Sequence, residues 1–352
     1  MIFFDVSKTG AAGHRSGLTR VSGRLRDGLG THALEARWDL KAHGFRNAAS
    51  FGPEKDDWVF TPELFSEEER PGLTAFLDSR PCRFAAIFHD AIPLKHPQIT
   101  WPRSVARHPG YLKLLSRFDR IWAVSHASRE ELLGFWRWQG LKQFPPVDVL
   151  ALGADFNAAA RAEALPAPSG GEPTVVPRFL CLGIIEPRKN QSFLLKVCEA
   201  LWADGARFEL HVVGRVNPHF GRPIVDQIKT LRRKHRSLLF FHEAADDAKV
   251  SRLFRHARAT LFPTLAEGCG LPLLESLWRG VPCLCSDLPV LRENADGGGC
   301  VALAPNDHAA WKSALAQIIH DDAWHTRLAR EAANRPLPTW SQAADTIRKA
   351  LR

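Results

Sequence analysis

Short apolar runs alternate with helical patterns along the second half of the chain. The runs predict buried strands at residues 179–182, 208–213, 238–241, 259–262 and 281–285. Between them, apolar residues recur at helical spacing and predict helices at residues 192–202 and 226–233. This alternation is typical of βαβ units around a parallel sheet.

The first half repeats the pattern less regularly. Its apolar runs predict strands at residues 2–6, 84–88, 121–124 and 147–152. Residues 18–29 predict a helix with Leu18, Val21, Leu25 and Leu29 on one face. Residues 158–177 are rich in proline and glycine with little periodicity, which predicts a linker. We therefore expect two doubly wound α/β domains joined near residues 155–175, with a cleft between them.

The composition is that of an ordinary soluble protein. With 352 residues, 45% hydrophobic and 24% charged, the chain can bury two cores, which argues against disulfide-stapled or disordered classes. The formal charge of +9 suggests nucleic acid, an anionic membrane or a phosphorylated substrate. The densest basic run, residues 232–236, lies in a helical pattern, and a solvated helix face explains it better than nucleic-acid binding. We expect no nucleic-acid partner.

The sequence also bears on compartment and metal content. Residues 1–6 lack the basic region and cleavage site of a signal peptide, and no apolar stretch is long enough to span a membrane. The seven cysteines include no Cys-x-x-Cys pair, which predicts buried thiols in a reducing compartment. No Asp-x-Asp element follows an apolar strand, and no His or Cys residues show ligand spacing. We expect a cytoplasmic protein without a metal site.

Candidate chemistry gathers in the turns that follow the predicted strands of the second half, because parallel strands place these turns on one edge of the sheet. Gly183 opens the first turn, and Arg188 and Lys189 stand just before a helix whose free N–H groups and dipole favour an anion. These cations are predicted diphosphate ligands. A basic pair on a solvated loop is the alternative for this motif alone.

A second turn strengthens the diphosphate hypothesis. Glu267 and Glu275 stand eight positions apart around a Gly-x-Gly turn, where glycine lets the backbone approach a ligand. We expect Glu275 to accept hydrogen bonds from ribose hydroxyls and Glu267 to face the group attached to the phosphate. Three N–H groups would face the same anion as Lys189, those of Cys269, Gly270 and Leu271. Together these features predict a nucleoside-diphosphate-sugar site.

These motifs resemble the retaining glycosyltransferases of family 4, which have the GT-B fold. The resemblance rests on an ordered set of segments covering nearly the whole chain, at residues 16–20, 88–93, 123–128, 152–155, 183–190, 267–275, 280–293 and 340–341. It implies an N-terminal acceptor-binding domain at 1–165, a C-terminal nucleotide-sugar-binding domain at 174–334 and a last helix at 335–352 that returns to the first domain. Both domains would be Rossmann-like and would face each other across the cleft.

The resemblance also implies an activity. A sugar would pass from a UDP-, GDP- or dTDP-sugar to a hydroxyl of a sugar or lipid-linked acceptor with retention of the anomeric configuration, in cell-surface polysaccharide or glycoconjugate synthesis. The leaving phosphate would take the acceptor's proton, so neither a protein base nor a cofactor or metal would be needed. Two alternatives stay open, a non-catalytic nucleotide-sugar-binding subunit and a GT-B nucleotide-sugar epimerase.

The family pattern adds further site residues. His89 matches a histidine that contacts the donor sugar or the reacting centre, and Gly17 matches the glycine turn into the first helix. Ile184 stands where many members carry arginine, so Arg215 is expected to help Arg188 and Lys189. Cys269 replaces a common phenylalanine. For Asp90, which follows His89 in the sequence, a structural role and an acceptor-binding role stay open.

One aromatic and basic segment of the first half lies outside these motifs. Residues 135–144 interleave Phe135, Trp136, Trp138 and Phe144 with Arg137 and Lys142. Packing of the aromatic side chains within a helix explains the segment. The alternative is an interfacial patch that brings the protein to the cytosolic face of an anionic membrane.

Overall fold

The computed structural model describes residues 1–11, 16–155, 161 and 176–352. The chain forms two compact units. Unit 1 comprises Met1–Gly153 and Pro338–Arg352, and unit 2 comprises Ala154–Leu337. The linker predicted at residues 158–177 falls almost entirely outside the described residues.

Unit 1 is built on a seven-stranded sheet in the order β3-β2-β1-β4-β5-β6-β7. All neighbouring strands are parallel except β2 and β3, which are antiparallel. The strands are β1 Ile2–Asp5, β2 Ala33–Asp39, β3 Gly44–Asn47, β4 Trp58–Thr61, β5 Arg83–Phe88, β6 Arg120–Ala123 and β7 Val147–Val149. The central strands β1, β4 and β5 are buried almost throughout, as expected for a sheet covered on both faces.

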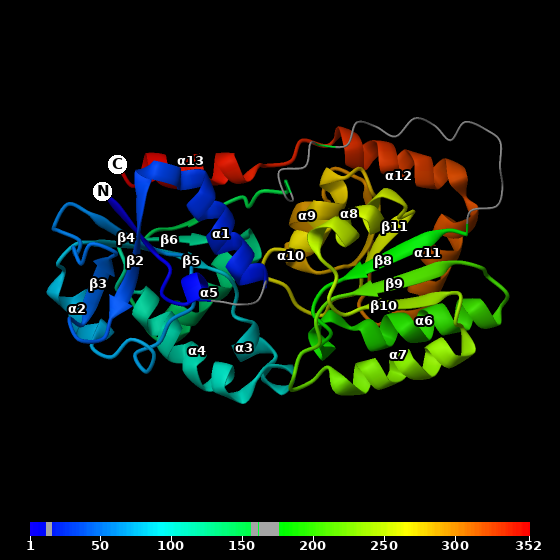
Figure 1. Cartoon of the computed structure of the whole chain (residues 1–352), viewed down its shortest axis with the longest axis horizontal. Coiled ribbons are helices and arrows are strands. Elements are labelled where there is room, and N and C mark those ends of the chain that lie inside the picture. Colours follow the sequence, from blue (N-terminus) through cyan, green and yellow to red (C-terminus); the bar gives the residue numbers. More distant parts are fainter. Residues whose placement is uncertain (12–15, 156–160, 162–175) are drawn as a thin grey trace. The chain divides into compact units, whose positions relative to one another are not determined.

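The helices of unit 1 begin and end at recognisable signals. Helix α1 starts after Ser16, whose side chain forms a capping box with Thr19 and satisfies N–H groups that the first turn leaves open. The helices are α1 Gly17–Leu29, α2 Leu73–Ser79, α3 Ile92–Lys95, α4 Pro102–Leu115, α5 His126–Trp138 and α13 Trp340–Ala350. Helix α13 packs along α1 (Figure 1). A Cβ at Gly28 of α1 would lie 2.7 Å from the Cβ of Ala344.

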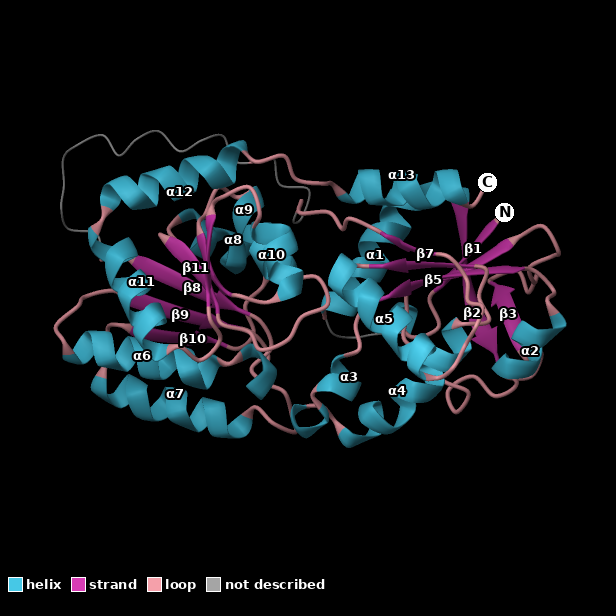
Figure 2. Ribbon diagram, turned by 180° about the vertical axis from the view of Figure 1, so that it is seen from behind, coloured by secondary structure: helices cyan, strands magenta, loops and turns pink. Residues whose placement is uncertain are grey.

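Unit 2 contains a six-stranded parallel sheet in the order β10-β9-β8-β11-β12-β13. Its strands are β8 Arg178–Leu182, β9 Glu209–Val213, β10 Leu239–His242, β11 Ala259–Phe262, β12 Cys283–Ser286 and β13 Cys300–Leu303. Its helices are α6 Gln191–Ala203, α7 Arg222–Lys234, α8 Asp247–Arg255, α9 Leu271–Trp278, α10 Pro289–Ala295, α11 His308–His320 and α12 Asp322–Asn334. Helices α6 and α7 lie on one face of the sheet and α8, α9 and α10 on the other (Figures 1 and 2).

The largest core of unit 2 lies between the sheet and the layer of α6, α7 and α11. It includes Phe179, Leu210 and Leu239 from the sheet and Leu195 and Ile228 from the helices. Burial of these apolar side chains is the main force holding the layer to the sheet. On the opposite face, α8 contributes Val250 and Phe254 to a smaller cluster around Leu180 and Val213.

Most elements predicted from the apolar pattern are present. The run at residues 259–262 is β11, and the other predicted runs overlap β1, β5, β6, β7, β8, β9, β10 and β12. Strands β2, β3, β4 and β13 were not predicted. The predicted α/β class with two Rossmann-like parallel-sheet units is confirmed.

Candidate functional site

The loops that follow β8 and β9 are pressed together backbone against backbone. Gly183 directly follows β8 with a φ of 145°, and its N–H donates to the carbonyl of Val213 at 3.0 Å. A Cβ at Gly214 would lie 1.8 Å from the Gly183 carbonyl oxygen, so this contact requires glycine. A parallel bridge between Ile185 and Val216 continues the pairing past the strand ends. The loop carrying the predicted diphosphate ligands is therefore rigidly placed.

Lys189 lies beneath this loop and is almost wholly buried. Its Nζ donates to Oε1 of Glu267 at 2.6 Å and lies 5.0 Å from the centre of the Phe262 ring. The Oγ1 of Thr264 donates to the same carboxylate oxygen at 2.7 Å. A buried ammonium is stable only with such a partner. The structure thus brings Lys189 and Glu267, which are 78 positions apart, into one ion pair.

The charges of this pair are reflected in the pKa values. Burial alone would raise the pKa of Glu267, but the adjacent Lys189 and Arg188 outweigh burial and hold the pKa below its usual range. Burial lowers the pKa of Lys189 more than Glu267 raises it. Within the pair, each partner favours the charged form of the other. A second anion beside Lys189 would favour the ammonium further.

Arg188 joins the same cluster from the short helical turn at Pro187–Lys189. Its Nε donates to Oε1 of Glu186 at 3.0 Å, and its Nη1 lies 3.3 Å from Oε1 of Glu267. The other oxygen of Glu186 accepts from Asn217 at 2.9 Å. The predicted ligands Arg188 and Lys189 are therefore held by carboxylates. Glu186 and Asn217, to which the sequence analysis gave no role, orient Arg188.

The Gly-x-Gly turn leads directly into α9. Gly270 has a φ of 83° and precedes the first helical residue, Leu271, and a Cβ on Gly270 would lie 2.4 Å from Leu291. The carbonyl of Cys269 accepts from Asn294 at 2.5 Å. Among the described residues, the N–H groups of 269, 270 and 271 have no hydrogen-bond partner. Glu275 lies one turn inside α9 and is buried. The turn thus offers open amides at a helix N-terminus.

Arg215 differs from the other predicted cations. It follows Gly214 in the loop after β9, and its backbone carbonyl accepts from Ile185 at 2.9 Å. Its side chain is exposed and forms no ion pair with any residue that the structure describes. Arg215 is therefore a solvent-facing cation on the loop that abuts the Gly183 turn.

His89 lies in unit 1, directly after β5. Its Nε2 is 2.7 Å from the carbonyl of Pro62, which can only accept, so Nε2 carries the hydrogen. Burial lowers the pKa of His89, against the opposing effects of the Pro62 carbonyl and Asp90, and the ring is neutral at pH 7. Its Nδ1 is thus an acceptor, with no partner among the described residues. Asp90 caps the following turn by accepting from the N–H of Ile92 at 3.0 Å.

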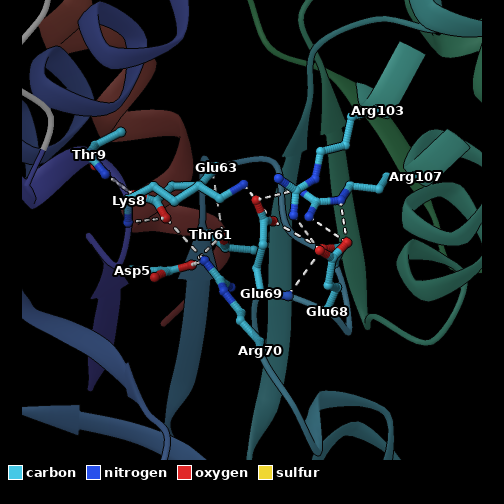
Figure 3. A network of polar contacts seen from close by, with 11 residues as sticks. Asp5, Lys8, Thr9, Thr61, Glu63, Glu68, Glu69, Arg70, Arg103 and Arg107 are labelled. Atoms are coloured by element: carbon cyan, nitrogen blue, oxygen red, sulfur yellow. Dashed lines mark hydrogen bonds and ion pairs between the residues drawn. The ribbon is translucent and has the colours of Figure 1, made fainter. Parts of the chain in front are cut away.

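A buried polar network lies beside this histidine at the ends of β1 and β4 (Figure 3). Glu63, fully buried, accepts from the backbone N–H groups of Lys8 and Thr9 and from Arg70 at 3.0 Å. Arg70 also pairs with Asp5 at 2.6 Å. Because Glu63 adjoins Pro62, the segment after β4 connects His89 with the loop after β1. This network was not predicted from the sequence, because β4 itself was not predicted.

Gly17, predicted from the glycine turn, is the first residue of α1. Nothing lies within 4 Å of the position of a Cβ there, so local packing leaves room for a side chain. Residues 12–15 of the preceding loop lie outside the described residues. In unit 2, the structure brings together Gly183, Arg188, Lys189 and Glu267, whereas His89 and Gly17 belong to unit 1.

The described residues contain neither a metal-binding cluster nor a membrane-spanning helix. No group of three or more His, Cys, Asp or Glu side chains there is arranged to hold a metal ion. No helix in the same part of the chain is both long and apolar enough to cross a bilayer.

Known proteins share features with the second half of the chain. Residues 168–335 match the family model of the glycosyl transferases group 1. Through this region the chain is similar to that family, and the glycosyltransferase resemblance predicted from the motifs is confirmed.

The individual relatives share 27–28% sequence identity with the chain. The chain is similar to the serotype-specific mannosyltransferase WbdA of Escherichia coli, 28% identical over 320 residues, which covers 84% of this chain and 37% of WbdA. It is also similar to the O-antigen chain mannosyltransferase B of E. coli, 27% identical over 261 residues, covering 72% of this chain and 65% of that protein. The chain therefore spans about a third to two thirds of the length of these relatives.

The fold has solved counterparts. The crystal structure of Anabaena HepE in complex with UDP matches with a TM-score of 0.67 and 13% identity, covering 99% of this chain and 98% of HepE. At this identity the likeness shows the fold alone. It supports the GT-B fold class predicted from the sequence.

Proposed function

We propose that the chain is a metal-independent glycosyltransferase that moves a hexosyl group from a nucleotide sugar to a hydroxyl of a sugar or lipid-linked acceptor, with retention of the anomeric configuration. The observation that carries the proposal is the buried Lys189–Glu267 pair beneath the Gly183 loop. The match to the family model and the names of the relatives support it. The relatives described above are mannosyltransferases, which favours a mannosyl donor and an O-antigen-type polysaccharide.

The roles of the site residues in the proposed transfer follow from the charges that form on the donor as its glycosidic bond to phosphate breaks. Cleavage of the bond between the anomeric carbon and the phosphate leaves negative charge on the diphosphate and positive charge on the sugar ring. Lys189 and Arg188 would stabilise the leaving diphosphate, and the open amides at Cys269, Gly270 and Leu271 would donate to it. These fixed donors would take the place that a metal ion holds in other transferases.

The remaining site residues would bind the rest of the donor. Glu275 would accept from ribose hydroxyls, and Arg215 would add charge at the solvent side of the diphosphate. Glu267, already paired with Lys189, would hold that ammonium in position and face the donor sugar. His89 would contact the sugar through its acceptor Nδ1, an assignment that rests on the family resemblance. Front-face attack, in which the leaving phosphate takes the acceptor's proton, then needs no protein base.

A donor screen tests this proposal. Thermal stabilisation and hydrolysis of UDP-, GDP- and dTDP-sugars would be measured for the wild type and for Lys189→Ala and Glu275→Ala. At saturating donor we expect stabilisation of roughly 3 kcal/mol, because binding to the native state alone shifts unfolding by mass action. Both variants should lose this response. Lys196→Ala, which removes an exposed lysine of α6, is the matched control and should respond like the wild type.

Loss of Lys189 alone leaves the buried Glu267 with only Arg188 as a charged neighbour and could unfold the loop. The double variant Lys189→Met with Glu267→Gln removes both charges at nearly constant shape and should fold. It should bind no nucleotide sugar. If it binds donors as the wild type does, or if no nucleotide sugar stabilises the wild type, the proposed site is wrong.

Among the aromatic side chains of residues 135–144, only some are exposed enough to contact a membrane. Trp136 is fully buried, and its Nε1 donates to the carbonyl of Leu112 at 2.8 Å, so it packs within unit 1. Trp138 is 77% exposed and Phe144 is 36% exposed. We propose that Trp138 and Phe144 contact an anionic membrane. Flotation with anionic vesicles at low salt should fail for Trp138→Ala, and absence of wild-type binding would remove this part of the proposal.

A further inference from the structure

A cavity of about 230 Å³ opens in unit 2 between α8 and the strands β8 and β9. Arg178, the first residue of β8, lines it, whereas the loops of the predicted donor site follow the last residues of the same strands. The cavity therefore lies toward the opposite ends of the strands from Gly183 and Gly214. Nothing in the proposed transferase reaction uses it.

The walls of the cavity combine apolar surface with a flat ring. Leu180, Leu253 and Ala257 line one part. His211, which is 9% exposed, lines another and stacks on Phe240 with the ring centres 4.7 Å apart and the planes 13° apart. A ligand that fills this space needs an apolar body, and a planar one would extend the stack.

The rim of the cavity carries positive charge without matching acids. Lys249 and Arg252 stand three residues apart on α8, a spacing that places both side chains on one helix face. Neither forms an ion pair with any residue in the described part of the chain. Arg178, by contrast, is neutralised by Glu209 at 2.7 Å. Two cations are thus available to an incoming anion.

A neighbouring histidine lies near one of these cations. His242 has its Nε2 3.0 Å from Nδ1 of His211. Burial together with the charges of Lys249, His211 and Arg232 lowers the pKa of His242 to about 4. The surroundings of the cavity therefore disfavour a further positive charge and favour an anion.

We propose that this cavity binds a small phosphate monoester with a flat apolar body, at a site separate from the nucleotide-sugar site. The phosphate dianion would lie between Lys249 and Arg252, which match its charge. The apolar body would lie against Leu180 and Leu253 with its face toward His211. This assignment does not depend on the proposed glycosyl transfer.

Phenyl phosphate is the probe, because it joins a dianion to a flat ring. The full chain, labelled at histidine, would be titrated with phenyl phosphate, inorganic phosphate and phenol while the ring signals of His211 and His242 are followed. Phenyl phosphate should shift both signals and bind at least tenfold more tightly than either fragment. Equal affinity for phenyl phosphate and inorganic phosphate, or no shift at millimolar concentrations, would overturn the proposal.

Two sets of variants locate the binding. Lys249→Ala with Arg252→Ala should weaken phenyl phosphate roughly tenfold for each cation removed. Arg255→Ala removes an exposed cation of the same helix that does not line the cavity, and it should bind like the wild type. Both side chains removed in the double variant reach solvent, so it should keep the wild-type melting temperature.

The predicted donor site could also bind phosphate, so the experiment is repeated with a variant in which that site is disrupted. Lys189→Met with Glu267→Gln removes the charges of its buried ion pair, and the phenyl phosphate shifts at His211 and His242 should persist in this variant. Loss of those shifts would assign the binding to the donor site and refute the second site. Persistence of the shifts together with loss of nucleotide-sugar binding would support both assignments independently.

Discussion

At the scale of single residues, charged side chains are buried to hold loops in place at the strand ends of both units. Lys189 and Glu267 form such a pair in unit 2, and Arg70 joins Asp5 and Glu63 in unit 1. Burying these charges costs solvation free energy that their mutual attraction only partly repays. Their effect is therefore better sought in the geometry of the loops than in stability. Glycines at close backbone contacts serve the same loops.

Gly214→Ala tests the contact between the loops after β8 and β9. The added Cβ would meet the Gly183 carbonyl oxygen at 1.8 Å, and we expect a loss of at least about 3 kcal/mol in the free energy of unfolding. Gly205→Ala is the control, since Gly205 also has a positive φ of 92° but no atom within 4 Å. It should cost about 1–2 kcal/mol from backbone strain alone. If urea titrations give the same loss of unfolding free energy for both variants, the backbone contact between Gly183 and Gly214 can accommodate a Cβ.

Glu63→Gln tests whether the network of Figure 3 positions His89. Whichever carboxylate oxygen the amide nitrogen replaces, its N–H groups would point at donors, either Thr9 N and Lys8 N or Lys8 N and Arg70, and the Pro62 segment should shift. We expect destabilisation of roughly 2 kcal/mol. The ¹⁵N signal of His89 Nε2 should move, and in transfer assays kcat should fall more than KM changes.

Glu68→Gln provides the comparison for this variant. Glu68 pairs with Arg103 and Arg107 at the exposed rim of the network and does not touch the loop after β1. Its side chain is largely solvated, so stability should change by less than about 1 kcal/mol. In Glu68→Gln, the ¹⁵N signal of His89 should not move. A His89 signal that also stays in place in Glu63→Gln would refute the positioning role.

At the scale of elements, the sequence pattern succeeded where burial is uniform and failed at edges and short strands. The predicted strands of unit 2 are continuous apolar runs because a parallel sheet is covered on both faces. Strand β2, beside the edge strand β3, has a mixed burial pattern, and β13 is only partly buried, so neither shows a clear period. Strand β4 is fully buried but spans only Trp58–Thr61, too short for a pattern to be distinctive.

The candidate site follows the same division. Arg188, Lys189, Gly270 and Glu275 could be predicted because each belongs to a motif continuous in sequence. The partners of these residues could not, because Asn217 reaches the site from the loop after β9 and Asn294 reaches it from helix α10. Glu63 was likewise invisible, since its role depends on Lys8 and Thr9, more than 50 positions away.

Two glycines of α1 test how closely helix α13 packs. Gly23→Ala adds a Cβ that meets nothing within 4 Å, and it should stabilise the protein by about 0.5–1 kcal/mol through helix propensity. Gly28→Ala makes the same change in the same helix but brings its Cβ 2.7 Å from Ala344. Overpacking should reverse the gain and cost about 1 kcal/mol. Thermal unfolding of the two variants should therefore shift in opposite directions, and parallel shifts would contradict the close packing of α1 on α13.

At the scale of the whole molecule, parts of the net charge of +9 can be assigned to particular sites. Part of it belongs to Arg188 and Lys189, which are paired with carboxylates in unit 2. Another part, Lys249 and Arg252, stands unpaired within the described residues at the rim of a second cavity. The basic run at residues 232–234 ends α7 as an exposed helix face. Steep salt-dependent binding of nucleic acid is not expected from this distribution.

The chain crosses between its units more than once, because unit 1 contains both the first 153 residues and the last fifteen or so. Helix α13 buries Trp340, Ala343, Ala344 and Ile347 within unit 1, beginning at a capping box formed by Thr339 and Gln342. A chain ending at Leu337 therefore loses part of the core of unit 1 and none of unit 2. The lost apolar burial should destabilise unit 1 by at least about 3 kcal/mol.

Calorimetry of the full chain and of the chain ending at Leu337 would measure this effect. We expect one unfolding transition to move down in temperature and the other to stay, because each unit has its own core. Gly214→Ala should move the other transition, which assigns it to unit 2. If the truncation lowers both transitions together, the units unfold as one cooperative body and the separate contribution of α13 to unit 1 is refuted.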